Sequence, residues 1–570
     1  MPNLPQALKN PAALAELRPG RRPGGRPDRR ELLKLAVAAA ATVTTTTSLW
    51  WPGTSWGQAK FSSNPFTLGI ASGSPTTDGV VLWTRLLPAG LFSSLGNDSA
   101  TVRWEVAHDD QFQRMVLQGS SVATAQLAHS VHVEVAGLEP NRWYFYRFHA
   151  GDFTSAVGRT RTLPAPDAKV DKLRLAYASC QRWEHGFYAA HRHMAQEQLD
   201  LVLFLGDYIY EYAGAANAVR NVTGGWVQSL DDYRQRYAMH KGDADLQAAH
   251  LACPWVFTWD DHEVHNDYAA DTAGFTSNAE PAFGDFARRR AAAYQAWYEH
   301  MPVRTSVLTK ALAGLVERAA KPTELRIYQN LRWGQLANLI LLDPRQYKDP
   351  IVCTPGGRLG SGTFDPSTCA ALKDPARSML GKAQEDWLDQ QLGQTSSSAG
   401  NWQVLAQGSL LGPRDFNLKG GSTIWNDGWD GYPAARSRLV DSLRKAPAGS
   451  AVVLGGDVHE NWVGHVKSDY ARAAGASSQP SDNVAVEFCG TGITSRATNT
   501  PRDVLDGILA KNTHFVFADN QKKGYGVCEF TPGVLKTTLR VVDDVTRSDS
   551  TASTLASFAV QAGKPVVERV

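Results

Sequence analysis

Residues 201–210 read Leu-Val-Leu-Phe-Leu-Gly-Asp-Tyr-Ile-Tyr, five apolar residues followed by a glycine, an aspartate and two tyrosines. A short run that is apolar at every position is typical of a strand buried on both faces of a sheet. Similar runs recur at residues 173–178, 255–258, 336–342, 404–406 and 452–454. Helical patterns lie between several of them, for example over 286–300 and 378–391. Strands that alternate with helices predict a layered α/β core.

Four of these apolar runs end in side chains that can bind metals. Cys180 follows the run at 173–178, and Asp207 and Tyr210 follow the run at 201–205. Asp260, Asp261, His262 and Asn266 follow the run at 255–258, and Asp457 and His459 follow the run at 452–454. Taken singly, each residue has a structural alternative to metal binding, since an aspartate can cap a helix and a cysteine is often a small buried hydrophobe. Ligands bind at the carboxyl ends of strands in open α/β sheets, so the joint pattern favours one shared metal site.

The ligand types indicate two different cations. The softer ligands are the Cys180 thiolate, the Tyr210 phenolate and the His459 imidazole. This set suits a transition metal of the ferric type. The carboxylates of Asp261 and Asp457 suit a hard cation such as calcium, and Asp207 can bridge both ions.

Residues 64–163 show only β patterns ahead of this core. Short runs rich in β-formers lie at residues 80–83, 102–106, 131–135 and 143–148. Such spacing predicts a small all-β sandwich of the immunoglobulin or fibronectin type. Residues 163–172, with two prolines and several charges, are predicted to be the linker.

The charge of the chain is nearly balanced, and its asymmetry lies at the N-terminus. Of 570 residues, 58 are basic and 56 acidic, which gives no reason to expect nucleic-acid specificity. Arg29-Arg30 precedes an apolar run over 35–43, too short to span a bilayer as a stable anchor. This pattern predicts a twin-arginine signal peptide over 1–59, with the translocase as export partner and a periplasmic or extracellular location. A plain basic arm is the alternative.

The six cysteines are too few for a disulfide scaffold in a chain of this length. Cys353 and Cys369 flank a loop rich in glycine, serine and proline and can close it as a bridge. Cys489 and Cys528 are a weaker candidate pair. Cys253 is interpreted as a packing residue.

The order of the motifs resembles the calcineurin-like metallophosphoesterase superfamily and, within it, the PhoD-type alkaline phosphatases and phosphodiesterases. The matching stretches are residues 64–73, 178–181, 206–212, 259–263, 342–347, 429–433 and 455–459. The resemblance implies a four-layer catalytic domain over 173–560, with β-sheets flanked by helices.

The resemblance also implies an Fe(III)–Ca(II) centre. Cys180, Asp207, Tyr210 and His459 would then hold iron. Asp207, Asp261 and Asp457 would hold calcium, with Asn266 as a further candidate ligand. Cys180 and Asp457 stand where the wider superfamily more usually has an aspartate and a histidine, which favours iron and calcium over two zinc ions.

The expected chemistry is attack on phosphorus by a metal-activated hydroxide. His262 is the candidate to protonate the leaving alkoxide or to steady the phosphate. Arg345 is expected to clamp a phosphate oxygen, and its alternative is a structural ion pair with Asp343 or another carboxylate.

The expected substrate is a small phosphomonoester, hydrolysed at alkaline pH. A phosphodiesterase or phospholipase D-like enzyme acting on lipid or polymer diesters is the alternative. A non-enzymatic surface binding module, in which the sandwich dominates function, is a third hypothesis, disfavoured because all the ligand types are present.

Overall fold

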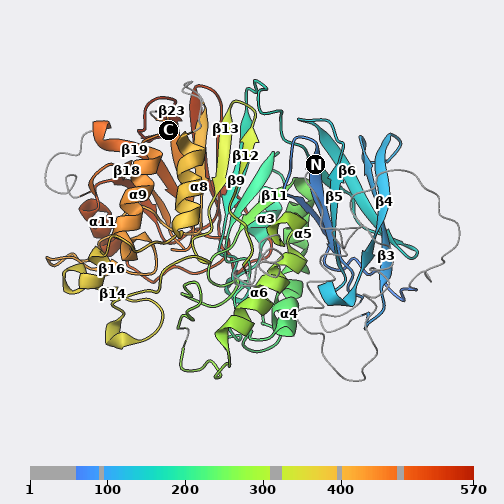
Figure 1. Cartoon of the computed structure of the whole chain (residues 1–570), viewed down its shortest axis with the longest axis horizontal. Coiled ribbons are helices and arrows are strands. Elements are labelled where there is room, and N and C mark those ends of the chain that lie inside the picture. Colours follow the sequence, from blue (N-terminus) through green and yellow to red (C-terminus); the bar gives the residue numbers. More distant parts are fainter. Residues whose placement is uncertain are drawn as a thin grey trace, which may run out of the picture.

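Two β-sheets packed face to face form the centre of the molecule (Figure 1). The computed structural model describes residues 60–88, 95–275, 277–308, 324–393, 401–447, 449–470 and 480–570. The first sheet contains, in spatial order, β24 (Glu568–Arg569), β23 (Ala552–Gln561), β22 (Val534–Val542), β21 (Lys523–Phe530), β9 (Leu173–Ala178), β10 (Leu201–Leu205), β11 (Trp255–Thr258), β1 (Ile70–Gly73), β2 (Gly79–Arg85) and β5 (Ser130–Ala136). The second contains β12 (Gln329–Trp333), β13 (Ala337–Leu341), β15 (Trp402–Ala406), β17 (Ala451–Gly455), β19 (Asn483–Cys489), β18 (Asn461–Lys467) and β20 (Phe515–Asp519).

The inner strands of both sheets are parallel and almost entirely buried. In the first sheet β9, β10 and β11 run parallel, and in the second β13, β15, β17 and β19 do so. One continuous apolar core fills the space between the sheets. All six predicted apolar runs are therefore confirmed as strands, because side chains on both faces of each strand are excluded from water.

Helices cover the outer faces of both sheets and complete four layers. Those on the first sheet are α3 (Ala189–Met194), α4 (Leu230–Lys241), α5 (Ala244–Ala252) and α6 (Phe286–His300). Those on the second are α8 (Lys382–Gly393) and α9 (Pro433–Leu443), while α11 (Arg502–Lys511) packs against β20. The predicted helix over 286–300 is confirmed, and Asp285 caps its first turn by accepting from Ala287 N.

The helix predicted over 378–391 was placed too early. In the structure α8 begins at Lys382, because Gly381 has a φ of 71° and Ser378 Oγ accepts a hydrogen bond from Gly381 N. A left-handed residue cannot lie inside a right-handed helix, so the chain turns before the helix starts.

The N-terminal strands form the predicted all-β sandwich. Strands β1, β2 and β5 face a second sheet made of β4 (Met115–Ala123), β3 (Ala100–Ala107), β6 (Trp143–Ala150), β7 (Phe153–Thr154) and β8 (Gly158–Arg161). Alternate residues of β6, namely Tyr144, Tyr146 and Phe148, are buried in the core between these sheets. This is the period of two that the aromatic run predicts.

The sandwich is continuous with the catalytic layers and lies at one end of the molecule (Figure 1). Gly73 of β1 pairs with Trp255 of β11, so the first sheet extends across the junction. Trp83 Nε1 donates to Glu299 O at the end of α6 over 2.9 Å. The exact bounds proposed for the two domains, 64–163 and 173–560, stay a prediction.

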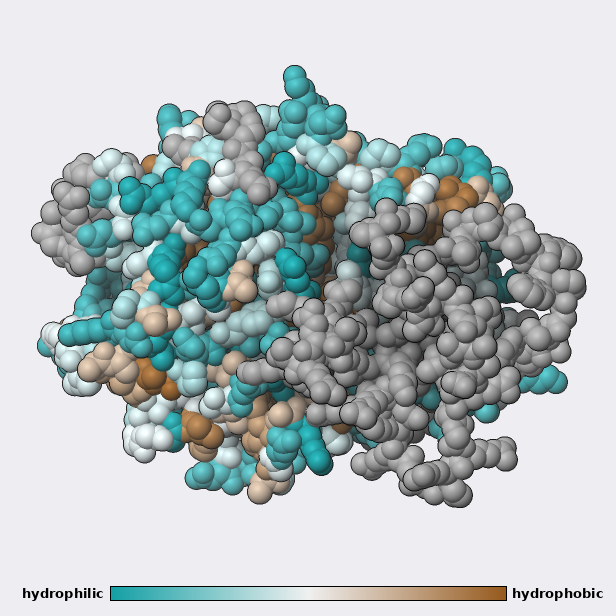
Figure 2. All heavy atoms as spheres, viewed as in Figure 1, coloured by the Kyte–Doolittle hydropathy of each residue, from teal (hydrophilic) through white to brown (hydrophobic). Residues whose placement is uncertain are grey.

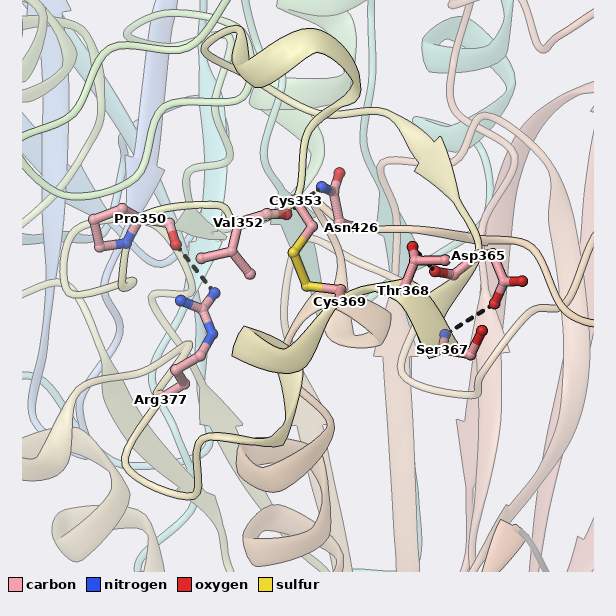
Figure 3. The surroundings of a disulfide bond; sticks show 9 residues. All are labelled: Pro350, Val352, Cys353, Asp365, Ser367, Thr368, Cys369, Arg377 and Asn426. Carbon is pink, nitrogen blue, oxygen red and sulfur yellow. Dashed lines mark hydrogen bonds between the residues drawn. A yellow bond between two sulfur atoms is a disulfide. The ribbon is translucent and has the colours of Figure 1, made fainter.

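A disulfide closes the loop between β13 and α8 (Figure 3). Cys353 and Cys369 are bonded with their Cα atoms 6.0 Å apart, which confirms the predicted bridge. Asn426 Nδ2 donates to Val352 O at 2.7 Å and ties the same loop to the segment after β16 (Ile424–Trp425). Strand β14 (Thr363–Phe364) pairs with β16 and strengthens this attachment.

The second candidate disulfide is wrong, because Cys489 and Cys528 are both free and buried. Cys489 belongs to the second sheet and Cys528 to the first. Facing sheets lie about 10 Å apart, beyond the usual span of a disulfide. Cys253 is buried in the core beneath α5, as the packing interpretation expects.

The surface that faces the viewer in Figure 2 is mainly hydrophilic over the described residues, with small, separate hydrophobic patches. Among those residues, helices do not reach the length and apolarity that crossing a membrane requires. The predicted signal peptide over 1–59 lies outside the described residues.

Candidate metal centre

Four strand ends bring the predicted ligands together at one edge of the two sheets. Strands β9, β10 and β17 are followed closely by Cys180, Asp207 and Asp457, each with a left-handed backbone. Their φ angles are 56°, 57° and 66°, and His459 has 56°. Non-glycine residues rarely adopt this conformation, and such strain gathers at functional sites.

The first group of ligands surrounds the Asp207 carboxylate. Ligand atoms of Cys180, Asp207 and His459 lie within 4.8 Å of one another. Tyr210 OH lies 2.8 Å from Asp207 Oδ2 and 3.1 Å from His459 Nε2. His459 Nδ1 donates to Arg496 O at 3.0 Å, which leaves the Nε2 lone pair directed at the group, the tautomer that a metal requires.

A second group shares Asp207 with the end of β11. Ligand atoms of Asp207, Asp261 and His262 also lie within 4.8 Å of one another. Burial raises the pKa of Asp207 well above its usual range; His262 opposes this rise, while the Asp261 carboxylate adds to it. Asp261 Oδ1 is buried and accepts no hydrogen bond from the described residues. Buried, crowded carboxylates of this kind are stable as anions only beside cations, so the donor set fits a metal centre.

Asp457 and Asn266 are less completely placed. Asp457 is half-buried, and its Oδ2 lies 3.4 Å from Ser409 Oγ. Asn266 Oδ1 accepts from Tyr212 OH at 3.0 Å, and its Nδ2 donates to Phe275 O. Among the described residues, Asp457 belongs to none of the compact groups of His, Cys, Asp and Glu side chains, and the roles of both residues as ligands stay predictions.

A third acidic group contains two residues that the sequence analysis missed. Asp261, Asp267 and Asp427 bring one ligand atom each within 4.8 Å of one another. Asp267 follows the Asp-His-Glu motif by only a few residues and has a left-handed φ of 57°, so the polar run after β11 was an available signal. Asp427 lies in a loop that follows no predicted strand, and it falls two residues before the family stretch at 429–433.

Arg345 is fully buried behind the carboxylates. Its guanidinium bonds to Asp260 through Nε, to Asp427 through Nη1 at 2.8 Å, and lies 3.7 Å from Asp261 through Nη2. These contacts support the ion-pair alternative, with Asp260 and Asp427 rather than Asp343 as the principal partners. The phosphate clamp stays an untested prediction.

His262 has a partner that the sequence analysis did not identify. Its Nδ1 donates to Glu211 Oε2 at 2.7 Å, and Glu211 also accepts from Asn266 N. Burial disfavours the charged imidazole, but the carboxylates of Glu211 and Asp261 outweigh burial and raise the pKa of His262 well above its usual range. Glu211 follows Tyr210 directly, but sequence position alone does not show which side chain it meets.

Two further features hold the strand-end loops in place. The Glu263 carboxylate accepts from the backbone N–H groups of Asp207, Tyr208 and Asp260, at 3.0, 2.7 and 2.9 Å. Gly206 has a φ of 104°, and a Cβ atom there would lie 2.4 Å from Asp260 N. Only glycine therefore lets the loops after β10 and β11 approach this closely.

Comparison with known proteins gives the same family over nearly the whole described chain. The family model for the PhoD-like phosphatase matches residues 175–539, and that for the PhoD-like phosphatase N-terminal domain matches residues 52–164. Alkaline phosphatase D of Bacillus subtilis (strain 168) is 42% identical over 517 residues, covering 90% of this chain and 83% of that protein.

A solved structure agrees with this relationship. The structure of PhoD matches with a TM-score of 0.80 and 41% identity, covering 90% of this chain and 93% of that one. The all-β domain followed by mixed α/β sheets is thus the architecture of this family. The chain belongs to the PhoD-like phosphatase family and is a phosphoric ester hydrolase.

Proposed function

We propose that the chain is an exported alkaline phosphatase whose site holds Fe(III) beside Ca(II). The observation that carries this proposal is the convergence of a thiol, a phenol, an imidazole and several carboxylates on Asp207. In this assignment Cys180, Asp207, Tyr210 and His459 would hold iron, and Asp207, Asp261 and Asp457 would hold calcium, with Asn266 as a further candidate ligand.

The chemistry of the two groups supports different metals. Thiolate and phenolate ligands favour a transition metal, whereas groups with only carboxylate donors favour a hard cation with oxygen ligands. The Asp261, Asp267 and Asp427 group has only carboxylates and is a further candidate position for a hard cation. Lys348 and Arg345 already pair with Asp427, which weakens its availability as a ligand.

The chain's own residues then have distinct tasks. When bound, the cations lower the pKa of a coordinated water and absorb negative charge on the phosphate oxygens. His262, held by Glu211 through Nδ1, directs Nε2 away from that carboxylate and is the group proposed to protonate the leaving oxygen. Arg345 keeps Asp260, Asp261 and Asp427 in fixed positions around the site.

Elemental analysis joined to a phosphoester panel tests this proposal. Purified protein should contain iron and calcium and should hydrolyse p-nitrophenyl phosphate faster than its bis ester at alkaline pH. Two zinc ions in a fully active protein would refute the metal assignment. Faster hydrolysis of the bis ester would favour the phosphodiesterase alternative instead.

The export part of the proposal rests on the N-terminal sequence. Arg29-Arg30 and the following apolar run support recognition by the twin-arginine translocase, with a periplasmic or extracellular destination. This route accepts folded proteins, which suits a site whose ligands come from strands far apart in the chain.

A further inference from the structure

Two arginines border the metal centre without a task in the proposed chemistry. Arg182 lies two residues after Cys180, and its N–H donates to Ser495 Oγ at 3.2 Å. Arg496 follows that serine directly, and its carbonyl accepts from His459 Nδ1 at 3.0 Å. The backbones of both arginines therefore lie beside the proposed iron ligands Cys180 and His459. We call the segments 182–185 and 495–496 the rim of the site.

His185 connects the two arginines. Its Nδ1 accepts from Arg496 N at 3.0 Å, and it ends the short helix η3 (Trp183–His185) that Arg182 precedes. Burial lowers the pKa of His185 to about 3, and the positive charges of Arg182, Arg496 and Lys523 contribute to this shift. Three cations thus act on one point of the rim.

Two carboxylates near these arginines, Glu184 and Glu460, already have cationic partners in Arg182 and Arg414. Arg182 Nε pairs with Glu184 Oε1 at 2.6 Å, and Glu184 is itself buried. Arg496 is exposed, and its guanidinium has no carboxylate within ion-pair distance among the described residues. The amine of Lys523 donates hydrogen bonds to His459 O and Thr491 Oγ1. An anion that approached this rim would find an available guanidinium.

The position of the Tyr212 ring beside His262 indicates which part of the substrate would lie at the rim. Tyr212 has its ring centroid 5.1 Å from that of His262. The Arg182 guanidinium carbon lies 4.3 Å from the centroid of the same Tyr212 ring. A leaving group that receives a proton from His262 therefore has Tyr212 and then Arg182 as neighbours.

We propose that Arg182 and Arg496 form a subsite for a second anionic group on the leaving-group side of the substrate. The preferred substrates would be phosphoesters whose leaving group carries a carboxylate or a further phosphate. Guanidinium groups bind both of these anions through paired N–H donors. This inference deepens the proposed function and rests on it.

A matched pair of substrates tests the subsite. 3-Carboxyphenyl phosphate and 3-carbamoylphenyl phosphate have nearly the same shape and differ by one negative charge. Replacing Arg496 by Gln should lower kcat/KM for the carboxylate substrate about fivefold more than for the amide, as expected for one partly exposed ion pair. The loss should lie in KM, because the charge pair forms in the bound ground state as well as in the transition state.

Three controls sharpen this experiment. The intrinsic difference in leaving-group reactivity cancels, because each substrate is compared between wild type and variant. Arg444→Gln removes an exposed arginine of the segment after α9, paired with Asp441, and should leave the ratio of the two substrates unchanged. Added NaCl should reduce the preference of the wild type more than that of Arg496→Gln, in which only Arg182 remains, because salt screens exposed charges.

Two results would overturn the subsite while leaving the proposed function intact. An unchanged substrate ratio in both Arg496→Gln and Arg182→Gln would show that neither arginine meets the leaving group. An equal fall of kcat for both substrates would show that the arginines hold the reacting phosphate instead. By contrast, a metal-loaded wild type that hydrolyses neither substrate would refute the proposed function and the subsite together.

Discussion

Glu211 stabilises one orientation and one tautomer of His262, and so acts on the proposed acid without facing the substrate. The two side chains are buried and 2.7 Å apart. The imidazole ring also packs 4.1 Å from the Tyr210 ring, so it is confined on two sides. The position of His262, the proposed proton donor, therefore depends on both Glu211 and the proposed ligand Tyr210.

Substitution of Glu211 by Gln should impair poor leaving groups selectively. Without the carboxylate the pKa of His262 falls, so less of the enzyme holds the proton at alkaline pH, and alkyl phosphates depend on protonation more than p-nitrophenyl phosphate does. We expect kcat for an alkyl phosphate to fall about 100-fold, with a smaller loss for p-nitrophenyl phosphate. Glu280→Gln, which alters the comparable His265–Glu280 pair at 2.9 Å, is the control and should not discriminate between the substrates. Equal losses in Glu211→Gln would contradict the proposed role of His262.

Substitution of Tyr210 by Phe should change the colour of the protein. A phenolate bound to ferric iron absorbs visible light by charge transfer, and the Tyr210 hydroxyl lies between Asp207 and His459. We expect a coloured wild type and a shifted or bleached band in the variant, recorded by visible spectroscopy alongside iron content. Colourless, active, iron-free wild-type protein would contradict the iron assignment.

Helix α4 joins the sandwich to the loop that carries Asp207. The Ser229–Asp232 capping box begins the helix, and Lys241 ends it. Lys241 Nζ lies 4.2 Å from the Trp83 ring of β2 and 5.3 Å from the Tyr208 ring. The amine is buried without a hydrogen-bond partner among the described residues, so this helix end carries a poorly solvated charge.

Stability should therefore rise with pH around this helix end. Burial lowers the pKa of Lys241 to about 7 from 10.5. Between these values the unfolded chain binds a proton that the folded chain does not, so the free energy of unfolding increases as pH rises through this window. Lys241→Met should remove that slope and stabilise the protein at pH 7 by about 1–3 kcal/mol.

Chemical denaturation at pH 7 and pH 9.5 measures this effect. Lys536→Met, at an exposed position of β22, is the matched control and should keep the slope of the wild type. Lys241→Met protein with the same pH dependence as the wild type would show that the amine is hydrated or paired in solution.

The whole molecule behaves as one assembly of sandwich and catalytic layers. Besides the β1–β11 pair, His132 of β5 bonds to Tyr298 O at 2.8 Å. The candidate ligands Cys180 and His459 follow strands of opposite sheets and meet only in the folded chain. The candidate site is therefore complete only in the folded chain.

Replacement of Arg29 and Arg30 by lysine should retain active enzyme in the cytoplasm. The twin-arginine route reads the arginine pair, so conservative loss of both guanidinium groups should block export. Cell fractionation with a phosphatase assay measures the distribution. Arg21→Lys with Arg22→Lys is a matched control that should be exported normally. Normal export of the Arg29/Arg30 variant would indicate a general secretory signal or a plain basic arm.

The sequence by itself determined the strands, the sandwich and which strand ends carry the candidate ligands. Continuous apolar runs and alternating apolar residues are local patterns that show directly which side chains are buried, as in residues 201–205 and 143–148. Cys180, Asp207 and His459 could be grouped in advance because the carboxyl ends of parallel strands share one edge. The motif order also indicated the family before any contact was known.

Only the tertiary structure decided which side chains pair across the elements. It showed that Glu211 meets His262, that Arg345 lies among aspartates, and that Asp427 joins the acidic group from a distant loop. It also separated Cys489 from Cys528 by placing them in different sheets. Such pairings depend on how sheets and loops pack in three dimensions, and packing leaves no periodic pattern in the neighbouring sequence.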